Sequence, residues 1–165
     1  MPLYKQNLAG LLSAFTIGCG LWTVVVAAAC VVYHDTFFSD RNIGYYLMNV
    51  FVMMLVGLSL SYLVGIFSRN SNSLSGIVNT LTLGMCFLCG VFVPLEVMGK
   101  NVKMAAQFLP IYWYERVNDI LTEGRIIQGS VYSDVMKAIG IQVVFAAAFV
   151  CLALALSKWR QENMK

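Results

Sequence analysis

Four long runs without an acidic or basic side chain divide this sequence. They cover residues 8–33, 43–67, 70–95 and 138–157. Each run can cross a hydrocarbon layer about 30 Å thick, which needs roughly 20 helical residues, and backbone groups in lipid must be paired within the segment. The alternation expected of a transmembrane β-barrel strand is absent. We therefore predict an all-α polytopic membrane protein, one domain over 1–165, with four transmembrane helices at about 9–33, 43–67, 74–93 and 138–157.

Small residues recur four positions apart on three of these predicted spans. Such stripes form grooves in which a neighbouring helix backbone can approach closely. The grooves serve either packing within the chain or, in a sharper interpretation, an interface between subunits. The three stripes are Gly10, Ala14 and Gly18; Gly57, Ser61 and Gly65; and Gly76, Thr80 and Gly84.

Several uncharged polar side chains lie inside the predicted spans. Each needs a partner in hydrocarbon, so each should either hydrogen-bond to a neighbouring helix or line a watery path. No span contains a carboxylate, lysine or arginine, which argues against a proton-coupled carrier. These polar residues are Asn49, Asn79, Thr80, Thr82 and Gln142.

The segment 94–124 has the pattern of two short amphipathic helices. Apolar positions recur at helical spacing from Leu95 to Leu109, Pro110 ends this first helix, and a second apolar stripe starts at Trp113. Gly124 is a helix-stop signal. We predict an extracellular amphipathic or re-entrant hairpin over 94–124, followed by a polar connection over 125–137.

Composition and charge agree with a membrane protein and set its orientation. Charged residues make up 12% of the chain, against about 25% in a soluble domain, and mean hydropathy is +0.75. Basic residues concentrate near the termini and in the 68–73 loop, so the positive-inside rule predicts a multi-pass protein of the cell membrane with both termini cytoplasmic. No basic stripe with interleaved aromatics is present, which gives no case for a nucleic-acid partner.

Motifs for chemistry are weak. Cys86 and Cys89 form a C-x-x-C in an apolar helix, where a reactive thiolate is disfavoured, so we interpret all five cysteines as small buried residues. His34 and Asp35 sit at a predicted loop and do not make a metal site. The phosphate-binding loop of nucleotide hydrolases is missing. We predict no catalytic residue, no metal and no cofactor, so any ATP energy must come from another polypeptide.

From about Ser59 onward the sequence resembles the C-terminal part of the ABC-2 class of ABC-transporter permeases. In that family a span leads into a G-x-[FV]-x-P-x-E-like stretch, and short extracellular helices follow, with a second proline and aromatics. The first two spans resemble the family by hydropathy alone. The matching positions are Gly90, Phe92, Pro94, Leu95 and Glu96, then Leu109, Pro110, Tyr112 and Trp113.

Two departures from the family pattern stand out. Met98 and Gly99 occupy the place where a second proline often follows the glutamate of the family. The family also has six spans per subunit, an N-terminal amphipathic helix and a cytoplasmic coupling helix, whereas this chain resembles spans three to six. We therefore expect a split half-permease, a truncated product or a piece of a longer gene.

The resemblance implies a permease component of an ATP-driven exporter for a drug, peptide or lipid. It implies an ATP-binding-cassette ATPase subunit, a second permease copy or half-permease, and membrane lipid as partners. The hairpin would act as an outer gate or merely anchor at the interface. Alternatives are a non-transporting membrane assembly or regulatory subunit, a truncated non-functional half-permease, or a small membrane enzyme acting on lipid. The residues that the resemblance places at the bends of this hairpin, which we call the bend residues, are Gly90, Phe92, Pro94, Glu96, Pro110 and Trp113.

Overall fold

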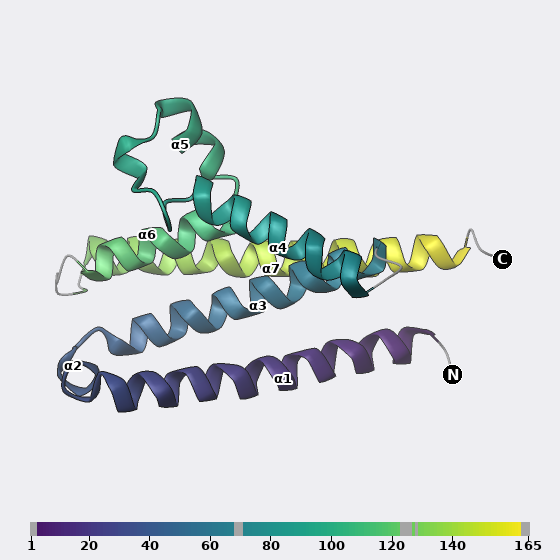
Figure 1. The fold of residues 1–165 in the computed structure, drawn as a ribbon, viewed down its shortest axis with the longest axis horizontal. Helices are drawn as coiled ribbons and strands as arrows, with labels where there is room; N and C mark the ends of the chain where they lie inside the picture. Colours follow the sequence, from purple (N-terminus) through teal and green to yellow (C-terminus); the bar gives the residue numbers. More distant parts are fainter. Residues whose placement is uncertain (1–2, 68–70, 123–126, 128, 163–165) are drawn as a thin grey trace.

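The fold is a bundle of long helices with one excursion. A computed structural model describes residues 3–67, 71–122, 127 and 129–162. Every element among these residues is helical (Figure 1). The elements are α1 (Leu3–Val32), α2 (His34–Ser39), α3 (Ile43–Phe67), α4 (Ser71–Leu88), the 3₁₀ turn η1 (Leu95–Val97), α5 (Lys100–Ala106), α6 (Pro110–Thr122) and α7 (Ser130–Glu162).

Helix α1 runs antiparallel to α3, and the short α2 lies at their turn. The rings of Trp22 and Phe51 meet edge to face with centroids 5.5 Å apart. Further along, Gly18 lies under Leu58, so higher numbers on α3 face lower numbers on α1. The sequence placed His34 in a loop, but it begins α2, a helix of six residues. We call the end of the bundle that carries α2 the α2 end.

Helices α3 and α7 run parallel, and α6 runs antiparallel to α3. Tyr45 faces Tyr132 with ring centroids 6.5 Å apart, and Asn49 bonds to Gln142 further along both helices. A parallel pair requires the chain to return between its members, and α4 and α6 make this return in two pieces. As a result α1 begins and α7 ends at the same end of the bundle, opposite the α2 end (Figure 1).

Two apolar clusters position the excursion, which we define as residues 89–109. The larger cluster joins α3, α6 and α7 through Val52, Val117, Leu121, Val135, Ala138 and Ile139. The smaller one joins the end of α4 to α5 and α6 through Cys89, Ala106 and Ile111. The two ends of the excursion therefore pack against α4 and α6, while α5 projects away from the bundle (Figure 1).

Three of the four predicted spans are long and apolar enough to cross a membrane. They are Ala9–Val32, Ile43–Ile66 and Ser130–Trp159. Helix α4 has 18 residues and ends at Leu88, five residues short of the predicted 74–93. It ends there because Gly90 adopts a φ of +101° and the Val91 amide donates to the Cys86 carbonyl at 3.2 Å, the outer bond of a Schellman motif. The four-span count and the re-entrant hairpin stay predictions.

The polar connection predicted over 125–137 is partly wrong. Helix α7 begins at Ser130, eight residues before the predicted span. The buried Val135 explains this early start, because it packs against Val117 and Leu121 of α6.

Pro110 also has a different role from the one expected: α5 already ends at Ala106, and Pro110 is the first residue of α6, where its missing N–H costs nothing. Gly124 lies outside the described residues.

Candidate functional site

A buried amide network joins the three helices at the base of the excursion. Asn49 of α3 is fully buried, as is Gln142 of α7. The Asn49 amide nitrogen donates to the Tyr114 carbonyl at 3.1 Å and to the Asn118 side-chain oxygen at 3.0 Å. The Asn49 side-chain oxygen accepts from Gln142 Nε2 at 2.9 Å. The sequence left two uses open for Asn49 and Gln142, which were hydrogen bonding to a neighbouring helix or lining a watery path. The observed bonds are of the first kind.

The network continues along α6 toward the molecular surface. Asn118 Nδ2 donates to Glu115 Oε2 at 3.2 Å. One turn further, the Thr122 hydroxyl donates to the Asn118 carbonyl at 2.8 Å and lies 3.4 Å from the Tyr46 hydroxyl. The side chains therefore connect the buried centre of the bundle to the polar face of α6.

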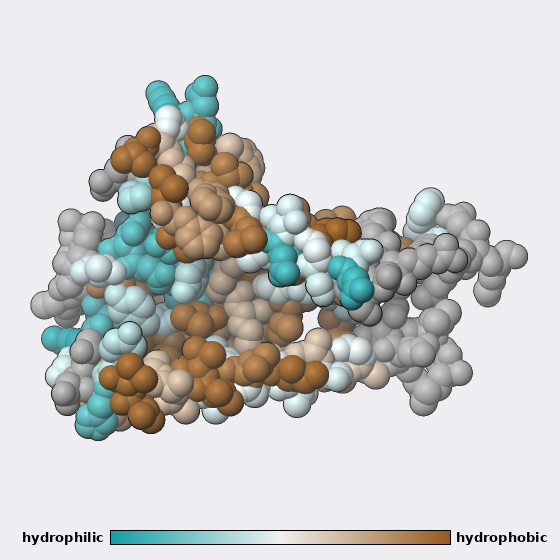
Figure 2. Space-filling view, viewed as in Figure 1, coloured by the Kyte–Doolittle hydropathy of each residue, from teal (hydrophilic) through white to brown (hydrophobic). Residues whose placement is uncertain are grey.

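That polar face borders a cleft between α6 and the excursion. The cleft has a volume of about 710 Å³. Figure 2 shows hydrophilic side chains over α6 below the projecting α5, with hydrophobic ones around them. Charges of both signs line it, together with two predicted bend residues. Its lining is Gly90, Pro94, Leu95, Lys103, Tyr112, Glu115, Arg116, Asp119 and Thr122.

The first bend residues shape one wall of this cleft. A Cβ on Gly90 would lie 2.9 Å from the Leu95 Cγ, so the positive φ and the close approach both require glycine. Pro94 precedes η1. Phe92 is 54% exposed and its ring lies 4.9 Å from that of Phe87. The Glu96 side chain lies outside the described part of the structure.

The second pair of bend residues fixes the start of α6. Pro110 is fully buried. Trp113 donates from Nε1 to the Gln107 carbonyl at 2.9 Å, and its ring meets that of Tyr112 edge to face at 5.3 Å. Since Gln107 closes α5, this bond ties α6 to the end of the excursion. Gating by these residues stays a prediction.

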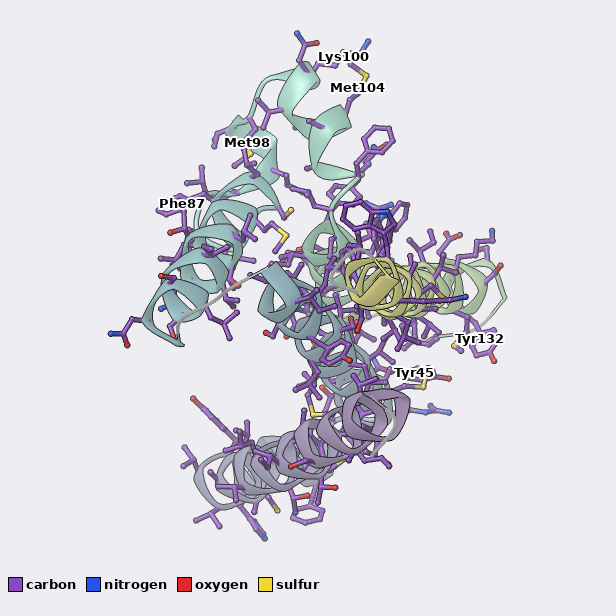
Figure 3. The ribbon with its side chains drawn as sticks, turned by 90° about the vertical axis from the view of Figure 1, so that its right-hand side faces the viewer. Tyr45, Phe87, Met98, Lys100, Met104 and Tyr132 are labelled. Carbon is purple, nitrogen blue, oxygen red and sulfur yellow. The ribbon has the colours of Figure 1, made fainter. Side chains whose placement is uncertain are left out.

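The small-residue stripes separate into one close contact and several open positions. A Cβ on Gly18 would lie 2.7 Å from Leu58 Cδ1. At the other glycines of the stripes, Gly10, Gly57, Gly65, Gly76 and Gly84, a Cβ would meet nothing within 4 Å. Ser61 is half-buried, and Asn79 and Thr80 are exposed on α4 and do not join the amide network. Figure 3 places α4, labelled at Phe87, at the edge of the bundle away from α7.

Sequence reasoning missed Asn118 and the charged lining of the cleft. The pattern of two amphipathic helices over 94–124 gave Lys103, Glu115 and Asp119 no role beyond positions outside the apolar stripes. The signal that could have found Asn118 is its wheel position: it follows Tyr114 by four residues and sits beside the apolar stripe of Val117. An amide next to a buried stripe is a candidate for contact with amides on neighbouring spans.

The residues that the structure describes include no group of three or more His, Cys, Asp and Glu able to hold a metal.

The interpretation of all five cysteines as buried is wrong for four of them. Cys89 is buried, Cys19, Cys30 and Cys86 are half-buried, and Cys151 is exposed. Cys151 lies on α7 beside a groove of about 550 Å³ between α1, α3 and α7, which the chain leaves open.

Comparison with known proteins identifies the family. A sequence model described as ABC-2 family transporter protein matches residues 6–155. Searches of curated proteins and of solved structures found no match. The family match includes the first two predicted spans, which the motifs alone reached only by hydropathy. Because it covers most of the chain and agrees with the three apolar spans, this chain belongs to the ABC-2 family of membrane transport proteins.

Proposed function

We propose that this chain is the transmembrane permease component of an ATP-driven ABC exporter. Its cargo is a hydrophobic or amphipathic molecule, such as a drug, a peptide or a lipid. The family match supports the permease role, and the three apolar helices support a multi-pass membrane location. The energy comes from a separate ATP-binding-cassette subunit.

The observation that carries this proposal is the uncovered polar face of α4. Asn79 and Thr80 are exposed, and Gly76 and Gly84 have open space around them. Polar groups on a membrane helix face protein or water rather than lipid, and small residues allow close backbone approach. A fourth crossing by α4 and α6 would therefore turn this face toward a second permease copy across a central path.

The arrangement of the helix ends supports one docking side for the ATPase. Helix α1 begins and α7 ends at the same end of the bundle, where basic residues gather in the sequence (Figure 1). We place that end in the cytoplasm, with the ATPase, and the α2 end outside. The bends at Pro94, Glu96, Pro110 and Trp113 would then form an outer gate at the excursion.

The test is ATP-dependent transport in vesicles that contain the chain and an ATP-binding-cassette subunit from the same source. Vanadate-sensitive efflux is measured with a hydrophobic dye, an amphipathic peptide and a fluorescent lipid. Thr80→Val and Asn79→Leu should remove most of it. Thr23→Val is the matched control, because the Thr23 hydroxyl is exposed on a span and donates to its own helix at Cys19, 2.8 Å away.

Two results would contradict the proposal. One is a stable chain that binds no ATP-binding-cassette subunit and exports none of the three probes. The other is equal transport by the Thr80→Val, Asn79→Leu and Thr23→Val variants, which would remove α4 from the path.

A further inference from the structure

The cleft beside α6 holds one charged side chain, Glu115, that lies level with the candidate span of α3. Asn49 bonds to the Tyr114 carbonyl and to Asn118, so Glu115, which lies between them in α6, is level with Asn49. Asn49 lies six residues after the start of α3, which is about 9 Å along the helix axis at 1.5 Å per residue. Charged groups within a membrane are costly and mark a functional site by default. Their presence here needs an occupant or a water-filled space.

These charges do not neutralise one another. Lys103 comes from α5, and Glu115, Arg116 and Asp119 come from α6. Among the described residues, Lys137 and Asp134 of α7 form an ion pair at 3.5 Å, and none of the four cleft charges forms an ion pair with another described residue. Two cations and two carboxylates therefore face one cleft of about 710 Å³, a volume that suits a small-molecule site.

Exposed apolar side chains lie near the cleft lining along the chain, since Phe92 falls between the lining residues Gly90 and Pro94. The rings of Phe87 and Phe92 lie 4.9 Å apart at a tilt of 49°, and each side chain is 54% exposed. On the excursion, Val97 is 74% exposed, Met104 50% and Phe108 80%. Figure 3 shows Phe87 on α4 and Met104 on α5, each pointing away from the bundle. A polar cleft with exposed apolar side chains on the adjoining segments matches a molecule that has a charged head and hydrocarbon tails.

We propose that this cleft binds the head group of a zwitterionic phospholipid that carries a primary amine. Its phosphate lies between Lys103 and Arg116, and its ammonium group bonds to Glu115 and Asp119. Charge-assisted hydrogen bonds of both signs are then satisfied at once. The two carboxylates disfavour a purely anionic head group, and a quaternary ammonium would need an aromatic cage where the cleft offers Tyr112 alone. The acyl chains lie along the exposed Phe87 and Phe92.

This inference does not depend on export. The lipid binds with or without an ATPase, and as cargo or as a fixed component. A chain that binds no lipid could still export its cargo, so that result would not contradict the proposed function. A chain that exports nothing could still bind the lipid, so a failed transport assay would not contradict this inference.

The test is native mass spectrometry of the full chain in detergent, titrated separately with phosphatidylethanolamine, phosphatidylcholine and phosphatidylglycerol. We expect phosphatidylethanolamine to bind about tenfold more tightly than the other two, the effect of one charge-assisted contact. Glu115→Gln with Asp119→Asn should remove this preference. Lys103→Met with Arg116→Met should weaken binding of all three lipids about tenfold. Lys137→Met with Asp134→Asn is the matched control and should change nothing.

Three outcomes would overturn the proposal: equal binding of the three lipids by the unchanged chain, equal affinities in the cleft and control variants, or displacement of the lipid by equimolar glycerophosphoethanolamine. The last would indicate a soluble ligand. Each variant is first checked by its melting temperature. If a double variant fails to fold, Lys103→Met and Asp119→Asn alone give the same contrast, because neither side chain belongs to the apolar clusters.

Discussion

Gln142 Nε2 on α7 donates a 2.9 Å hydrogen bond to the Asn49 side-chain oxygen on α3, deep inside the bundle. The two partners are not equivalent. Asn49 makes two further bonds to α6, whereas the Gln142 side-chain oxygen is buried with no partner among the described residues. The network is therefore centred on Asn49.

We predict that Asn49→Leu destabilises the fold more than Gln142→Leu. The first change leaves buried groups on both α6 and α7 without a partner and should cost about 1–3 kcal/mol. The second leaves one buried group, the Asn49 oxygen, without its donor, but it also removes the unpartnered Gln142 oxygen, so it should cost less than the first. Unfolding by sodium dodecyl sulfate in mixed micelles measures both. Ser59→Ala is the control, since the Ser59 hydroxyl bonds within its own helix. Equal costs for Asn49→Leu and Gln142→Leu would contradict the assignment.

Gly90→Ala should distort the turn that ends α4. The φ of +101° and the 2.9 Å approach to Leu95 Cγ both oppose a side chain, and we expect a cost of about 1–3 kcal/mol. Gly99→Ala is the control, because Gly99 has a φ of −62° and open space. Thermal unfolding in detergent and protease cleavage between 91 and 109 report the effect. An alanine tolerated equally at both positions would show that this turn is not constrained.

Gly18→Leu should loosen the contact of α1 with α3. A Cβ there would meet Leu58 at 2.7 Å and Met54 at 3.3 Å, so a larger side chain must push the helices apart, at about 1–3 kcal/mol. Gly20→Leu, two residues along the same helix, has nothing within 4 Å and should be near neutral. Cysteine crosslinking across the two helices, with melting temperature, distinguishes them. If Gly20→Leu is the more harmful change, Gly20 faces a partner outside the chain.

Trp113→Phe should cost about 0.5–1.5 kcal/mol, the net value of the bond from Nε1 to the Gln107 carbonyl. Trp113→Ala should cost about 3 kcal/mol or more, because it also removes packing against the α3–α6–α7 cluster. Chemical unfolding in detergent gives both values. Indistinguishable Phe and Ala variants would mean that the hydrogen bond, and not the ring, holds α6 to the excursion.

Predictability from sequence depended on whether local pattern or tertiary contact decided each feature. The first two spans were placed within a residue or two, because charged residues flank both apolar runs. The end of α4 at Leu88 could not be read from a run that stays uncharged to residue 95. The early start of α7 depends on burial of Val135 by α6, which is a contact between distant segments. The two-piece return through α4 and α6 is equally invisible to hydropathy.

The candidate site was half visible for the same reason. Asn49 and Gln142 stood out as amides in apolar runs, but Asn118 looked like one more polar residue on an amphipathic helix. Likewise, Glu115 and Lys103 are ordinary surface charges until α6 is known to lie beside α3.

The break between Leu88 and Pro110 has a mechanical consequence. Helix α6 is held to α3 by the hydrogen bonds of Asn49, and to α3 and α7 by the larger apolar cluster. The end of α4 meets α6 through the smaller cluster, where Cys89 packs with Ile111. A tilt of α4 is therefore absorbed at this joint before it reaches α6. In the proposed fourth crossing by α4 and α6, one half can act as a moving lever while the other half serves as its fixed support, which a single unbroken helix could not do.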